Sequence, residues 1–128
     1  MQKIELQKLD YKLSLCKLSD VGMVDFTREL VFLSRTPDEI SLVCESDYVP
    51  PNFIEMEEGW RALRVAGVLD FELIGIVANI SRILAEAEIS VFVVSTYNTD
   101  YILMKEEKFE AGVQALVRGG YALCGAGA

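Results

Sequence analysis

The sequence predicts an α+β protein whose second half folds as a ferredoxin-like βαββαβ unit. Apolar residues recur every three or four positions over residues 73–87 and 106–118, which is typical of amphipathic helices. Short runs rich in β-branched residues flank both stretches, as expected for strands. With 128 residues, the chain has the length of one compact domain or of two very small modules that share a core.

Three strands are predicted in the first half. Residues 11–18 alternate apolar and polar side chains, which indicates a half-buried strand. Two apolar runs, residues 30–34 and 40–45, lie on either side of Pro37, whose ring fixes φ at the first position of a type I turn. We therefore expect these two runs to form a hairpin.

A short helix is predicted next, after the break at Pro50 and Pro51. Asn52 can cap it and Glu55 can reach back three positions, and the helix would end at Gly59. Residues 19–29 are too few and too mixed for a crossover helix. The first half thus looks like the βαββαβ plan with its first helix reduced. We predict two tandem modules, residues 1–55 as a degenerate N-terminal module and residues 56–128 as a complete one.

The second half shows the full pattern. Its predicted elements are a strand from Trp60 to near Asp70, a helix over 73–87, a buried strand over 89–96, a turn at 97–100, a strand over 101–105, a helix over 106–118 and a strand over 121–124. Gly119 and Gly120 end the second helix.

Charge and hydrophobicity limit the partners. Twelve Lys and Arg against 20 Asp and Glu give a net charge of −8, which argues against nucleic acid and against an anionic membrane surface. Hydrophobic residues make up 52% of the chain, and we expect that a face is kept for a partner subunit in a homodimer.

The reactive residue types argue against an enzyme. The chain has no histidine, the commonest general base and metal ligand, and its cysteines are Cys16, Cys44 and Cys124, without CxxC spacing. We expect no metal, no cofactor and no disulfide, and a cytoplasmic protein without a signal peptide or a membrane span. The remaining enzymatic alternative, a carboxylate pair such as Glu72 and Asp100, lacks a further convergent acid or base.

Four segments carry a family resemblance. They read WRALRVAG, LDFELIGIVANISRILAEAEISVF, STYNTDYILMKEE and, in the first half, FLSRTPDEISLVCES. These segments resemble ACT-domain proteins, specifically the tandem-ACT group that includes bacterial regulatory proteins and the cytosolic arginine sensors of animals. The resemblance implies a ferredoxin-like ACT fold, modules that pair side by side, and an amino acid bound at the seam between two of them.

The resemblance also implies a binding site. In the arginine sensors the ligand contacts come from a glycine-turn segment and from an STxxxD-type turn. Carried over to this sequence, the contact residues are Ile74, Gly75, Ile76, Thr96, Tyr97 and Asp100. We add Glu72 as a second partner for a cation. The sensors carry four modules per chain and this chain has length for two at most, so the seam would form between its halves or with a second chain.

These residues also have physical roles of their own. At Gly75 a ligand carboxylate could approach the first free amides of a helix, although a glycine there could equally serve close packing of strand and helix. The Asp100 carboxylate could accept from an ammonium or guanidinium group, although Asp is common in turns for local reasons. Tyr97 could stack on the stem of the ligand or simply cover the core.

The sequence therefore predicts a regulatory sensor that binds a small molecule, most simply an amino acid, at an ACT–ACT interface and is read by a partner protein. The alternative is an ACT-type interaction or oligomerisation module that has no ligand.

Overall fold

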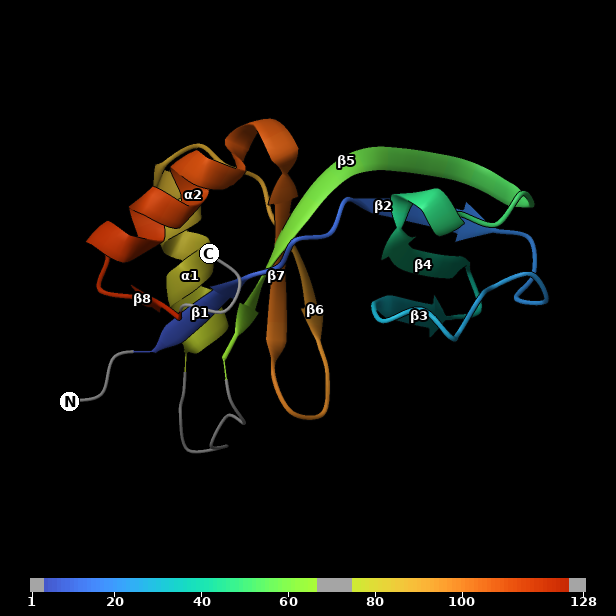
Figure 1. Cartoon of the computed structure of the whole chain (residues 1–128), viewed down its shortest axis with the longest axis horizontal. Helices are drawn as coiled ribbons and strands as arrows, with labels where there is room; N and C mark the ends of the chain where they lie inside the picture. The colour runs from blue at the N-terminus through green and yellow to red at the C-terminus, as the bar shows by residue number, and fades with distance from the viewer. Residues whose placement is uncertain (1–3, 67–74, 125–128) are drawn as a thin grey trace. The chain divides into compact units, whose positions relative to one another are not determined.

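The computed structural model describes residues 4–66 and 75–124 (Figure 1). In chain order the elements are β1 (Glu5–Lys8), β2 (Leu13–Leu18), β3 (Val31–Arg35), β4 (Ile40–Glu45), the 3-10 turn η1 (Ser46–Tyr48), β5 (Phe53–Val65), α1 (Ile76–Glu86), β6 (Phe92–Ser95), β7 (Asp100–Lys105), α2 (Glu106–Arg118) and β8 (Ala122–Leu123). They form two compact units. We call residues 1–10 with 61–128 the main unit, and residues 11–60 the inserted unit.

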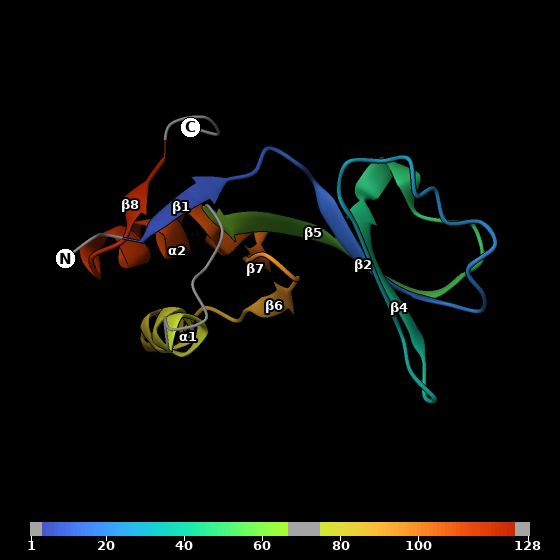
Figure 2. The ribbon, with the colours of Figure 1, turned by 90° about the horizontal axis from the view of Figure 1, so that it is seen from below.

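The main unit has the βαββαβ order that the sequence predicts, in the series β5-α1-β6-β7-α2-β8. Its strands pair in the order β8-β1-β5-β7-β6. Both helices cover the same face of this sheet (Figure 2), because their apolar sides share one core with the strands. Fully buried members of this core include Leu6, Val65, Ile80, Ile102 and Leu116.

Strand β1 is an addition to this plan that the sequence analysis did not predict. It lies between β5 and β8, antiparallel to β5 with Leu6 opposite Val65, and parallel to β8. The side chain of Leu6 is completely buried. Arg61 holds the chain after β1, because its guanidinium donates to the Leu9 carbonyl at 3.1 Å and lies over the Phe109 ring. Residues 5–8 are thus an internal strand of the main unit.

The inserted unit is an antiparallel sheet of strand order β3-β4-β2-β5. The predicted hairpin is confirmed, since β3 and β4 pair antiparallel with Arg35 opposite Ile40. One face carries an apolar cluster that contains Cys16, Leu18, Leu42 and Cys44. Residues 11–60, all of which are described, contain the short turn η1 and no α-helix.

The helix predicted from Asn52 to Gly59 is wrong, because β5 runs through these residues and pairs with β2. The Asn52 side chain caps no helix and instead donates to the Asp20 carbonyl at 3.1 Å. A weak local helix signal is thus outweighed by a ladder with a strand far away in the sequence. The predicted boundary between residues 55 and 56 falls inside β5, and the assignment of residues 1–55 and 56–128 as tandem modules stays a prediction.

Most other elements of the second half agree with the prediction, but the buried strand predicted over 89–96 is wrong in its burial: β6 spans Phe92–Ser95, pairs with β7 at one edge of the sheet, and has only partly buried or exposed side chains. Helix α2 has the predicted bounds, the turn between β6 and β7 lies where expected, and α1 begins at Ile76 within the predicted stretch. Strand β5 ends at Val65, earlier than the predicted end near Asp70.

A β-bulge at Gly59 interrupts the ladder between β2 and β5. Leu13 lies opposite Trp60 and Ser14 opposite Glu58, so Gly59 has no opposite residue. Its φ is +86°, in the left-handed region that glycine adopts without steric cost. A Cβ atom at this position would meet nothing within 4 Å, so the glycine is required by its backbone conformation and not by packing.

We expect Gly59→Ala to lower the free energy of unfolding by about 1 kcal/mol, because a Cβ atom disfavours the left-handed conformation. Gly59→Asn is the matched control and should lower the free energy of unfolding clearly less than Gly59→Ala, since Asn tolerates the left-handed conformation better than Ala. Urea unfolding of the three proteins measures the difference. Equal losses for Ala and Asn would show that the backbone conformation is not the cause.

Candidate ligand-binding site

The start of α1 is the first part of the candidate site. Gly75 precedes the helix with φ +81°, and its carbonyl accepts the first helical hydrogen bond from the Asn79 amide at 2.8 Å. No described side chain caps this helix, and its first turn contains no acidic residue. Among the described residues, no side chain accepts from the amides of the first turn, and the helix dipole adds to the attraction of these amides for an anion.

The geometry at Gly75 argues against one of the two interpretations of this glycine, and its contact with a ligand stays a prediction. A Cβ atom built there would meet nothing within 4 Å, so close packing of helix and strand does not require the glycine. The positive φ requires the glycine, because glycine adopts this conformation without steric cost. Gly75 is also exposed, so its surroundings are open to a ligand.

The turn between β6 and β7 is the second part. Ser95 and Asp100 are the last cross-strand pair, and the Ser95 hydroxyl donates to the Asp100 carboxylate at 2.6 Å. The turn is closed by the Thr96 amide, which donates to the Thr99 carbonyl at 2.8 Å. The Thr96 hydroxyl donates to the same carbonyl at 3.0 Å. Tyr97, at the tip, is 90% exposed and supports no core.

Thr99 fixes this turn to the central strand. Its hydroxyl is buried and donates to the Val65 carbonyl at 2.7 Å, at the last residue of β5. Because Val65 is the last residue of β5, this hydrogen bond holds the end of β5 beside the β6–β7 turn.

The structure brings the two predicted segments to the same end of the main unit. In Figure 1 the start of α1 and the β6–β7 turn both lie at the lower end of this unit, and Figure 2 looks onto that end. Gly75, Ile76, Thr96, Tyr97 and Asp100 thus share one end of a single unit. Glu72 and Ile74 lie outside the described residues.

Ser95 is a residue that the predicted set omits. It orients the Asp100 carboxylate directly, and its position could be found in the sequence, because residues five apart on either side of a four-residue turn form a cross-strand pair.

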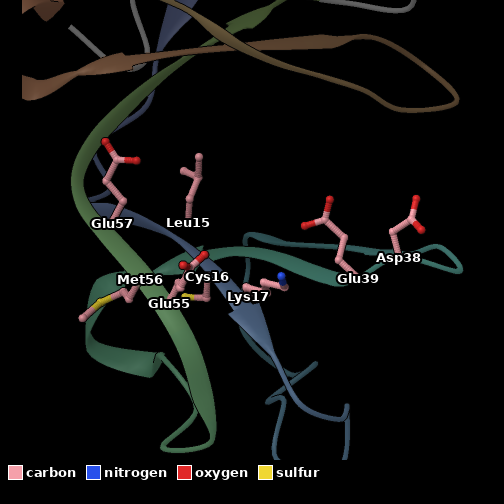
Figure 3. A pocket seen from close by; sticks show the side chains of 8 residues that line it. All are labelled: Leu15, Cys16, Lys17, Asp38, Glu39, Glu55, Met56 and Glu57. Atoms are coloured by element: carbon pink, nitrogen blue, oxygen red, sulfur yellow. The ribbon is translucent and has the colours of Figure 1, made fainter.

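Two hollows lie elsewhere. One, of about 830 Å³, is in the inserted unit and is lined by residues of β2, the β3–β4 hairpin and β5 (Figure 3). The other, of about 420 Å³, lies between α1 and α2 and is lined by residues that include Arg82, Ile83 and Arg118. Neither contains a residue of the predicted site.

The described part of the chain contains neither a cluster of metal ligands nor a helix that could span a membrane. Within residues 4–66 and 75–124, no three His, Cys, Asp or Glu side chains are grouped so that they could hold a metal ion. Nor does any helix there have the length and apolar character needed to cross a membrane.

A family comparison identifies the fold. The model of the ACT domain family matches residues 55–118, which is half of the chain. The chain belongs to the ACT domain family. The matched residues begin in β5 and end with α2, so they include both parts of the candidate site.

Among characterised relatives, this ACT domain protein is similar to the cytosolic arginine sensor for mTORC1 subunit 1. The human and bovine sensors are each 40% identical to it over 62 residues, which is 48% of this chain and 19% of the sensor. The chain therefore matches about a fifth of the length of these relatives.

Solved structures of similar fold include several bacterial proteins. A protein from Agrobacterium tumefaciens superposes with a TM-score of 0.85 at 28% identity, over 97% of this chain and 94% of that one. A Vibrio cholerae protein of unknown function gives a TM-score of 0.73 at 21% identity, over 91% and 89%. The aspartate kinase of Clostridium acetobutylicum gives 0.64 at 14% identity, over 94% of this chain and 35% of the kinase. The last two likenesses concern the fold alone.

We expect Thr99→Val to lower the free energy of unfolding by about 1–2 kcal/mol, because the buried Val65 carbonyl loses its hydrogen-bond donor. Thr36→Val is the matched control: its hydroxyl hydrogen-bonds within an exposed turn, where water can replace it, so this change should lower the free energy of unfolding less than Thr99→Val does. Chemical unfolding of both variants checks the prediction, and a Thr99→Val protein as stable as the control would contradict it.

The cysteines give a second prediction. Cys16 and Cys44 are buried, and the neighbouring Cys16 thiol and burial raise the pKa of Cys44. Cys124 is partly exposed. Because only the thiolate reacts, iodoacetamide at pH 8 should modify Cys124 in the folded protein and the other two only after unfolding. Peptide mass spectrometry measures the order, and rapid modification of folded Cys44 would refute it.

Proposed function

We propose that this protein is a regulatory sensor that binds an amino acid at the end of the main unit where Gly75 and the β6–β7 turn lie. The observation that carries the proposal is that the start of α1 and the β6–β7 turn, whose Asp100 carboxylate accepts from Ser95, lie at the same end of the main unit (Figure 1). Membership in the ACT family and similarity to an arginine sensor support a regulatory role that involves a small molecule.

Each end of the ligand has a counterpart in this arrangement. The α-carboxylate would lie against the first free amides of α1, next to Gly75 and Ile76. The Asp100 carboxylate, oriented by Ser95, would accept from the α-ammonium or from a cationic side chain. Tyr97 is exposed and could stack on the stem of the ligand, and Thr96 would contribute from the turn. We keep Glu72 and Ile74 as further contact residues on the sequence argument alone.

The mechanism we propose is linkage between modules. The ligand would bind at the seam of two ACT modules, supplied by a homodimer or by the tandem modules of one chain. It would favour one module arrangement to the extent that it binds that arrangement more tightly. A partner protein in the cytoplasm would then respond to the favoured arrangement, and the protein itself would catalyse no reaction.

A second function, an interaction module without a ligand, is favoured by one observation. The polar groups of the turn already have partners within the turn, since Ser95 satisfies Asp100 and Thr96 bonds to Thr99. A ligand would have to add to these hydrogen bonds or replace them.

Isothermal titration of the protein against the twenty amino acids distinguishes the two functions. The sensor predicts binding tighter than millimolar for at least one of them, and a rise in melting temperature with that amino acid. If none binds and neither the melting temperature nor the oligomer size changes, the sensor function is refuted and the interaction module stands.

For the amino acid that binds, Asp100→Asn should weaken binding about 10- to 100-fold, because loss of a charged hydrogen bond costs roughly 1.5–3 kcal/mol. Asp10→Asn, at an exposed position of the same unit, is the control and should bind as the unmodified protein does. Equal affinity of all three proteins would remove Asp100 from the site.

A further inference from the structure

The inserted unit carries most of the net charge of the protein. Residues 11–60 contain four Lys and Arg against ten Asp and Glu, a net charge of −6 out of the −8 of the whole chain. None of the residues proposed to bind the amino acid belongs to this unit.

The same unit exposes large apolar side chains. Phe53 is 42% exposed, Ile54 57% and Met56 40%, and all three lie on the first residues of β5. A register shift between β2 and β5 falls at Leu18 and Phe53, so Ile54 has no opposite residue on β2. Three large apolar side chains exposed within four residues of one strand are unusual for a surface that only meets water.

An acidic groove adjoins this strand, and Met56 lines it (Figure 3). Lys17 lies opposite Glu55 and Leu15 opposite Glu57, so the four share one face of the sheet. Asp38 and Glu39 reach the groove from the β3–β4 hairpin, and Figure 3 shows them across from Glu57 with their carboxylates directed to the same side. Four carboxylates against the single ammonium of Lys17 make the groove strongly negative.

Phe53 and Met56 lie opposite Leu18 and Cys16, on the other face of the sheet from Glu55 and Glu57. We propose that the first residues of β5, with Phe53, Ile54 and Met56, bind a basic, extended segment of a partner protein together with the adjoining acidic groove. Lys or Arg side chains of the segment would face the carboxylates of Asp38, Glu39 and Glu55. Its apolar residues would cover the exposed side chains of β5. An extended segment suits this surface, since alternate residues of a strand point to opposite sides and can meet charged and apolar groups in turn.

Charge complementarity selects this occupant over a second copy of the chain. Two inserted units placed face to face would bring their acidic grooves together, and like charges in contact destabilise an interface. A basic segment removes that repulsion and also gains from attraction at a distance, which salt weakens.

Fluorescence anisotropy with short labelled peptides tests the proposal on the whole protein. The probe is an eight-residue peptide of alternating Lys and Val. We expect this peptide to bind. Its affinity should fall at least 10-fold as the salt concentration rises from 50 to about 300 mM. A peptide in which Ser replaces Val should bind at least 10-fold more weakly. A peptide of alternating Glu and Val should not bind. Binding of the Glu–Val peptide, or no binding of the Lys–Val peptide, overturns the proposal.

Paired variants locate the binding. The double variant Glu39→Gln, Glu55→Gln should bind the Lys–Val peptide at least 10-fold more weakly. The double variant Asp10→Asn, Glu88→Gln removes the same charge from the main unit and should change the affinity less than 2-fold. Equal losses would mean general attraction to an acidic protein and would refute the groove.

A second pair tests the apolar part. Ile54→Ser should lower the affinity for the Lys–Val peptide at least 3-fold. Val117→Ser, at an exposed position on α2, should leave this affinity unchanged. Sedimentation of the same proteins detects the competing occupant. If the protein self-associates and Ile54→Ser alone abolishes that association, this surface binds a second copy and the proposal fails.

Discussion

The organisation of the main unit depends on the last residues of β5. Leu63 and Val65 are completely buried, and Val65 lies opposite Leu6 of β1. The carbonyl of the same residue accepts the buried hydroxyl of Thr99, which fixes the β6–β7 turn. One residue therefore joins the core, the added N-terminal strand and the turn that carries Asp100. Because an unsatisfied buried carbonyl is costly, this hydrogen bond constrains the position of the whole turn.

That constraint bears on the proposed binding of an amino acid. A small zwitterion needs an anion site and a cation site at a fixed separation, and such a separation requires rigid supports. Here the anion site would be the start of a helix and the cation site a carboxylate in a turn that is hydrogen-bonded within itself and to β5. The internal hydrogen bonds of the turn thus have two consequences, since they orient Asp100 and also reduce its need for a ligand.

The two proposed surfaces differ in the chemistry they would recognise. The described end of the main unit combines the start of a helix with the Asp100 carboxylate, which would suit a small ligand carrying both charges. The inserted unit combines several carboxylates with exposed apolar side chains, which suits a longer segment of protein. A regulatory protein needs both a ligand and a partner that responds to it, and under the two proposals the main unit would bind the ligand and the inserted unit the partner.

The sequence alone determined the elements whose signals are local. The apolar period of α2, the Pro37 turn between β3 and β4, and the polar turn before Asp100 depend on neighbouring residues, and the structure confirms them. The tertiary structure decided what depends on distant partners. It placed β1 between β5 and β8, made a strand of residues 53–59 where a helix was expected, and bonded Ser95 to Asp100. Strand pairing joins residues far apart in the chain, so a short segment such as residues 5–8 or 53–59 carries too little information by itself to reveal its partner.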